Sequence, residues 1–180
     1  RESKTILVPI DFSDCATDVV REASKTAEQS GARVVLMHIV QIPEGLDQST
    51  PIQPDGSRES VTALEHLLNE AERRMREFVA VAKEREVEVS LRIEHGDAAA
   101  TIVAASKEPG VERVIMGTHA RKGLTKLLLG SVADQVRKQS PRPVEAIPTV
   151  HKSYCKAGSC GWCATHESSA VVQLRVEQNG

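Results

Sequence analysis

Apolar residues gather in five short runs over the first 150 residues, and these runs predict β-strands. They lie at about residues 5–10, 33–40, 87–93, 111–116 and 143–150. The first two are nearly continuous, as is typical of parallel strands that are buried on both faces. The third alternates apolar and charged residues, so we expect it to be half buried near a sheet edge. Glu145 and Pro148 interrupt the last run, and a proline there also indicates an edge strand.

Helical periodicity fills the intervals between these runs. The first predicted helix runs to about Ser30, with Ser13 or Asp14 as its expected cap. The others extend from about Ser60 to Arg85, from Ala98 to Ser106 and from Val132 to Gln139. Gly31 is placed to end the first helix, and Asp97 is placed to cap the third. Residues 41–57 contain three prolines and two glycines without periodicity, which indicates an exposed loop.

The alternation of strands and helices predicts the fold class. Strands joined by helical crossovers are parallel, and the crossovers are right-handed. We therefore expect one doubly wound α/β domain over residues 1–150, with a five-stranded parallel sheet and helices on both faces. In such sheets ligands bind at the carboxyl ends of the strands, near the switch point in strand order. Asp11, Ile39, Gly96 and Gly117 are predicted to lie at those ends.

Residues 117–131 contain the parts of a phosphate clamp. An apolar strand is expected to break at Gly117, a basic segment with Arg121, Lys122 and Lys126 follows, and Gly130-Ser131 begins a helix. Glycine lets the backbone approach an anion closely, and the amides and dipole at a helix start attract it. A solvated basic loop is the alternative interpretation of the same charges.

Several motifs, in this order, resemble the universal stress protein family over about residues 3–150. They are Ile6-Leu7-Val8-Pro9-Ile10-Asp11-Phe12-Ser13, Leu36-Met37-His38-Ile39, Gly96-Asp97, Met116-Gly117-Thr118-His119 and Leu127-Leu128-Leu129-Gly130-Ser131. The resemblance implies a Rossmann-like sheet of order 3-2-1-4-5 and a homodimer through the last strand. It also implies, in one branch of the family, ATP or another adenine nucleotide held without established catalysis.

The nucleotide-binding branch carries the pattern G-x2-G-x9-G-[ST]. Carried over to this chain, the resemblance places Asp11 on the ribose and the Ile39 backbone at the adenine edge. It gives the phosphates to the backbone amides of Gly117, Gly130, Ser131 and Val132 and to the Ser131 hydroxyl, and lines the pocket with Pro9 and Met116. Ala120 stands where the pattern has its second glycine. If that position needs a left-handed backbone, alanine costs roughly 1–2 kcal/mol.

Composition narrows the classes of partner. The formal charge is −2 and aromatic residues are scarce, so neither general attraction to nucleic acid nor base stacking is expected. No apolar run approaches the roughly 18 residues that span a bilayer, and no signal-peptide pattern is visible. We therefore expect no membrane partner, a cytoplasmic location and reduced cysteines. His38 is predicted to be a hydrogen-bonded core residue, and Cys15 a small buried side chain.

Residues 151–180 differ in composition and form a Cys/His-rich tail. Cys155, Cys160, Cys163 and His166 have the spacing C-x4-C-x2-C-x2-H, which suits a tetrahedral zinc site followed by a short strand. His151 is an alternative fourth ligand, and a redox-active dithiol or a tail without special role is the alternative for the whole motif. The resemblance does not explain this extension.

The leading hypothesis is a non-catalytic protein that binds an adenine nucleotide and carries a metal-binding tail. A second class stays open: a nucleotide-free interaction or structural protein whose tail docks a partner or the second subunit. Slow ATP hydrolysis is a third, although no general base can be assigned from the sequence.

Overall fold

The computed structural model describes residues 4–13, 15–56, 58–120 and 130–150. Its centre is a five-stranded sheet in the order β5-β2-β1-β6-β7, and all four pairings are parallel. The strands are β1 (Thr5–Pro9), β2 (Arg33–Val40), β5 (Val89–His95), β6 (Val111–Ala120) and β7 (Val144–Val150). When only the strands of this sheet are numbered along the chain, the order is 3-2-1-4-5. The predicted fold class is therefore confirmed.

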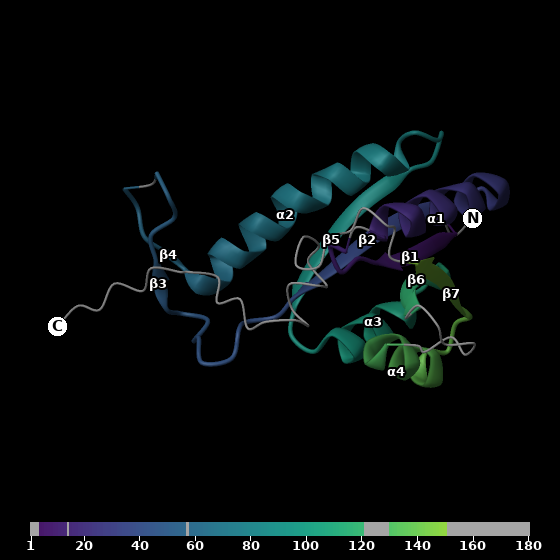
Figure 1. Ribbon diagram of the computed structural model, residues 1–180. Helices are drawn as coiled ribbons and strands as arrows, with labels where there is room; N and C mark the ends of the chain where they lie inside the picture. The colour runs from purple at the N-terminus through teal and green to yellow at the C-terminus, as the bar shows by residue number, and fades with distance from the viewer. Residues whose placement is uncertain (1–3, 14, 57, 121–129, 151–180) are drawn as a thin grey trace.

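Helices cover both faces of the sheet (Figure 1). They are α1 (Ala16–Ser30), α2 (Ala63–Ala82), α3 (Ala98–Ser106) and α4 (Ser131–Gln139). One apolar cluster joins α1 and α2 to the side chains of Ile6, Val8 and Ile10. The other joins α3 and α4 to Leu7, Met37 and Val114. Alternate residues of the central strands therefore serve opposite faces, as the pleat requires.

Two predicted caps are confirmed, and a third is wrong. Gly31 ends α1 with a φ of 65°, and the Asp97 side chain accepts a hydrogen bond from the Ala100 amide at 2.8 Å. Ser13 does not cap α1, because its own amide donates to Asp11 and the helix begins only at Ala16. The residue at the cap position is Cys15, which makes no side-chain cap bond.

The segment predicted as a loop, residues 41–57, contributes to a small hairpin. β3 (Pro51–Ile52) pairs antiparallel with β4 (Val61–Thr62), and the Ile52 side chain is buried. The hairpin runs directly into α2, whose start is fixed by a capping box between Thr62 and Glu65. The helix therefore spans Ala63–Ala82, rather than residues 60–85 as the periodicity predicted.

The fourth sheet strand is longer than its apolar run. We expected it to end at Met116 and to turn at Gly117, but β6 continues to Ala120. The reason is β7, which pairs with β6 through Gly117↔Ile147 and on to Ala120↔Val150. Neighbouring backbone thus overrides the local preference of glycine for turns.

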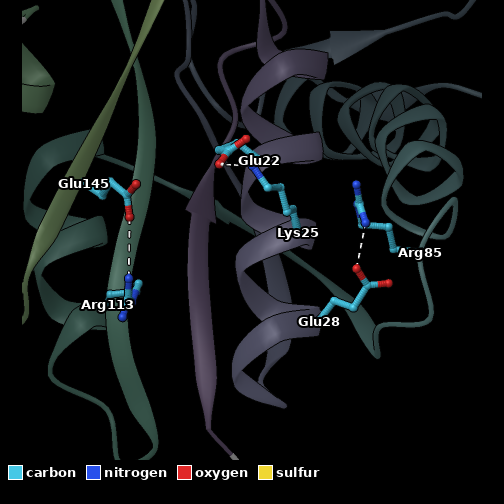
Figure 2. A network of polar contacts seen from close by, with 6 residues as sticks. All are labelled: Glu22, Lys25, Glu28, Arg85, Arg113 and Glu145. Carbon is cyan, nitrogen blue, oxygen red and sulfur yellow. Dashed lines mark hydrogen bonds and ion pairs between the residues drawn. The ribbon is translucent and has the colours of Figure 1, made fainter.

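Ion pairs join neighbouring elements on the surface (Figure 2). Arg85 after α2 meets Glu28 of α1 at 2.7 Å, and Arg113 of β6 meets Glu145 of β7 at 3.6 Å. The second pair explains how an acidic residue fits in a sheet strand, since its side chain is exposed and faces a cation. Each exposed pair contributes about 0–1 kcal/mol, so packing rather than charge holds these elements together.

Candidate functional site

The sheet is notched at the carboxyl end of its central strand. β1 ends at Pro9, while its neighbours continue to Val40 in β2 and Ala120 in β6. The register runs as far as Pro9↔Met37 on one side and Leu7↔Val114 on the other. Because α1 follows β1 on one face and α4 follows β6 on the other, this notch is the switch point of the fold.

The backbone of Ile39 faces the notch. In a parallel strand, successive residues direct their N–H and C=O groups to alternate neighbours. In β2, the Arg33 amide donates to Lys4 and the Met37 carbonyl accepts from Ile10, whereas Val40 accepts from Gly96 on the side of β5. Odd-numbered residues of β2 therefore face β1, and Ile39 is the first of them beyond the last paired residue of β1.

Pro9 and Gly117 face the notch from the other side. The Thr5 amide donates to Gly110, so odd-numbered residues of β1 face β6, and the missing N–H of Pro9 falls where that ladder ends. In β6 the Val114 amide donates to Pro143, so odd-numbered residues, Gly117 among them, face β1. The proline therefore costs no hydrogen bond to β2 and helps to end the β1–β6 ladder.

An apolar wall lies beside the notch on the face covered by α3 and α4. Ile39 and Met116 are 8% and 6% exposed and belong to one cluster with Leu7 and Met37, against which Val132 packs. Pro9 follows Leu7 at the two-residue period of a strand and so points to the same face. Of the residues that the sequence analysis assigned to the nucleotide, Ile39 and Met116 thus share one apolar cluster with Val132 packed against it, and Pro9 lies on the same face of the sheet.

The start of α4 lies next to this wall, since Val132 in its first turn packs against the cluster. Gly130 is the N-cap residue, contributes no side chain to the cap, and is exposed together with Ser131. A Cβ built on Gly130 meets nothing within 4 Å, and its φ of −59° suits any residue. Neither the backbone nor the packing of the described residues requires glycine there, whereas a closely bound anion would.

Asp11 is exposed just beyond β1, and its Oδ1 accepts a hydrogen bond from the Ser13 amide at 3.0 Å. The two other polar predictions near this strand end are confirmed. His38 Nδ1 lies 2.7 Å from the Ile10 carbonyl, and Cys15 is buried. Since a carbonyl only accepts, His38 carries its proton on Nδ1, and burial lowers the pKa of the ring below 6.5.

Sequence reasoning missed two residues at this strand end. Phe12 has a φ of 61°, and Arg74 of α2 lies over its ring. A positive φ at phenylalanine has no local sequence signal, and Arg74 is one of many charges on a helix interpreted as solvated. Ala120 pairs with Val150 at the end of β6 and does not adopt the left-handed conformation considered for it.

Several predicted residues lie outside the described part of the chain. They are Arg121, Lys122 and Lys126 of the basic segment, His151, and the tail ligands Cys155, Cys160, Cys163 and His166. Within residues 4–13, 15–56, 58–120 and 130–150, no three His, Cys, Asp or Glu side chains are grouped to hold a metal ion. Over the same residues, none of the helices has the length and apolar character needed to cross a membrane.

A parallel sheet of this order, covered on both faces and notched at the switch point, defines a Rossmann-like α/β protein, a class in which ligands bind at the strand ends. Comparison with known proteins shows to which family of this class the chain belongs. The model of the universal stress protein family matches residues 2–148, and the chain belongs to that family.

Known relatives agree with this assignment. Universal stress protein MJ0577 of Methanocaldococcus jannaschii is 29% identical over 149 residues, covering 78% of this chain and 92% of the relative. The universal stress protein of Archaeoglobus fulgidus in complex with dAMP superposes with a TM-score of 0.59 at 20% identity, covering 82% of this chain and 99% of that one. A universal stress protein in complex with cAMP gives 0.59 at 22% identity, over 83% and 99%. At these identities the two structures establish the shared fold.

Proposed function

We propose that this protein binds an adenine nucleotide, ATP in the first instance, in the notch at the end of β1 and does not turn it over. The observation that carries the proposal is the Ile39 backbone, whose N–H and C=O face the notch beyond the last paired residue of β1. A donor beside an acceptor matches the Watson–Crick edge of adenine. The relatives solved with cAMP and dAMP support an adenine ligand for this fold.

The other proposed site residues each contact one part of the nucleotide: the base, the ribose or the phosphates. Pro9 and Met116 line the base, Asp11 accepts from the ribose hydroxyls, and Ala120 closes the strand beside the phosphates. The phosphates lie at the start of α4, on the backbone amides of Gly117, Gly130, Ser131 and Val132 and on the Ser131 hydroxyl. This assignment uses the helix start at Gly130, a residue without a capping side chain, where the dipole favours negative charge.

The proposal assigns no catalytic residue. His38, the histidine at the end of β2, directs its ring to the α1–α2 face and contacts Phe12, whereas the proposed pocket lies on the α3–α4 face. Its proton is held by the Ile10 carbonyl. Incubation with ATP and magnesium is expected to yield no ADP above that of a sample without protein.

The proposed phosphate site is tested by replacing Gly130 and measuring ATP affinity by titration calorimetry. A Cβ at position 130 meets no atom of the described residues within 4 Å and the φ is allowed, so Gly130→Val is expected to leave thermal stability unchanged. The branched side chain would occupy the position of the phosphates, and ATP affinity is expected to fall at least about tenfold, or 1.4 kcal/mol. Ala104→Val, at an exposed position of α3, adds bulk away from the notch and serves as the control. Equal affinity of the two variants would contradict the assignment.

We also propose a homodimer through β7. It is an edge strand, and its odd-numbered residues face β6, so the missing N–H of Pro148 falls on the outer edge. The other even-numbered residues of β7 direct their backbone N–H and C=O groups to the outer edge, where a second copy of the strand can pair with them. Sedimentation velocity is expected to give a dimer, and Ala146→Pro, which removes one more outer donor, is expected to shift it towards monomer. A monomer for the unaltered chain would contradict this proposal.

For the tail, we propose zinc bound by Cys155, Cys160, Cys163 and His166. The support is their spacing and the preference of zinc for thiolate and imidazole ligands. Elemental analysis of protein without a histidine tag is expected to give about one equivalent of zinc, and Cys160→Ser is expected to lower it. Retention below a tenth of an equivalent would leave the docking role of the tail as the better explanation. The cytoplasmic location stays a prediction from the sequence.

A further inference from the structure

Phe12 holds an unfavourable backbone conformation next to the proposed ribose ligand. Its φ of 61° is the only positive value among the described non-glycine residues. A side chain with a Cβ rarely adopts this region unless surrounding contacts impose it, and such residues cluster at functional sites. Here the conformation falls in the connection between β1 and α1, directly after Asp11, whose carboxylate accepts a hydrogen bond from the Ser13 amide.

Three side chains contact the Phe12 ring on the α1–α2 face of the sheet, opposite to the face that carries the proposed pocket. The His38 ring is 4.0 Å away between centroids, and the Phe78 ring of α2 is 6.1 Å away. The Arg74 guanidinium lies 4.1 Å from the ring centroid, within the range of a cation–π contact. His38 also bonds the Ile10 carbonyl, so the same group of side chains holds the residue before Asp11 and the residue after it.

Close packing alone does not hold the ring. Phe12 is half-buried, and a hollow of about 300 Å³ lies beside it, lined by Ser13, Thr17, Arg74, Glu77, Phe78 and Val81. The neighbouring arginines of α2 are engaged differently: Arg73 pairs with Glu70 and Arg76 with Glu72. Arg74 is thus the cation of this helix that closes over the ring, from the side where core atoms leave space.

We propose that Arg74, Phe12 and His38 are positioning residues that set the place of Asp11 for the nucleotide, from the face of the sheet opposite to the ligand. This inference rests on the proposed function, because it assigns a purpose to the conformation at Asp11. Its consequence is that α2, which packs on the face of the sheet opposite to the proposed pocket, controls nucleotide affinity through the Phe12 ring.

The first test compares Arg74→Met with Arg76→Met, which removes the same charge from an exposed position of the same helix. Arg74→Met is expected to weaken ATP binding about five- to tenfold, the range for loss of one oriented hydrogen-bonding group. Arg76→Met is expected to stay within twofold of the unaltered protein. An equal loss of ATP affinity in both variants would show that Arg74 acts only through its charge and would overturn the proposal.

Phe12→Gly separates positioning from packing. Glycine accepts the φ of 61° without strain, so thermal stability is expected to fall by less than for Phe78→Ala, which empties the same cluster without relieving strain. ATP affinity is nevertheless expected to fall about tenfold. Full affinity in Phe12→Gly would overturn the proposal, since the ring would then serve the fold alone.

A measurement without nucleotide distinguishes failure of this inference from failure of the proposed function. Hydrogen exchange at the Ser13 amide reports the bond to Asp11 Oδ1 directly. In Arg74→Met this amide is expected to exchange at least about tenfold faster, while the amides of α3 keep their protection. Unchanged exchange at Ser13 would overturn the positioning role even if ATP binds, and faster exchange without any ATP binding would retract the nucleotide alone.

Discussion

Ser24 carries a buried hydroxyl that makes no hydrogen bond among the described residues. The residue is fully buried in α1. Ser24→Ala removes that hydroxyl and raises helix propensity, so the free energy of unfolding is expected to rise by about 1 kcal/mol. Chemical denaturation measures it. A loss of stability would show that the hydroxyl has a partner in solution.

His38 makes stability depend on pH. Burial lowers its pKa below 6.5, with Arg74 adding to the shift while the Ile10 carbonyl and Asp11 oppose it. The unfolded chain therefore binds a proton more readily than the native one, and stability is lost as pH falls from about 6.5 through the lower folded pKa. Melting temperatures at pH 7.5 and 5.5 are expected to differ less in His38→Gln, whose amide also donates to a carbonyl. An unchanged difference would contradict the assignment.

Residue-level prediction succeeded where the conformation is decided locally. Gly31 and Asp97 act as caps because a glycine after a helix and a carboxylate before one satisfy nearby backbone groups. It failed at the start of α1, where Cys15 rather than Ser13 is the cap residue, and at Phe12. The conformation of Phe12 has contacts from residues distant in sequence, such as His38 and Arg74.

At the scale of elements, the start of α2 offers the sharpest prediction. Thr62 Oγ1 accepts from the Glu65 amide, and the Glu65 carboxylate accepts from the Thr62 amide at 2.9 Å. Thr62→Ala opens this capping box and is expected to cost about 1 kcal/mol of stability. Thr26→Ala in the interior of α1 is the control and is expected to be neutral or slightly stabilising. Equal effects would show that the box contributes nothing.

Elements with a clear period were predicted from the sequence, and those without one were not. The strands β1 and β2 and the body of each helix follow from apolar spacing. The hairpin of β3 and β4 has two residues in each strand, too few to show a period. The extension of β6 past Gly117 depends on pairing with β7, which no local pattern reveals.

At the scale of the molecule, topology was predictable because parallel strands with helical crossovers admit few arrangements. The position of the notch was predictable only in outline. Which backbone groups face it depends on the register of β1 against β2 and β6, and a shift by one residue would turn Ile39 and Gly117 away. The family resemblance proposed Ile39 and Gly117 as site residues, and the register shows that their backbone groups face the notch.

Amide chemical shifts during an ATP titration test the central claim most directly. The nucleotide account predicts saturable changes at Ile39, Gly117, Ser131 and Val132, which come from the three separate elements β2, β6 and α4. Smaller changes are expected at Phe12 and Ser13, and none along β5 at the sheet edge. No change at millimolar ATP, or changes confined to the α1–α2 face, would contradict it.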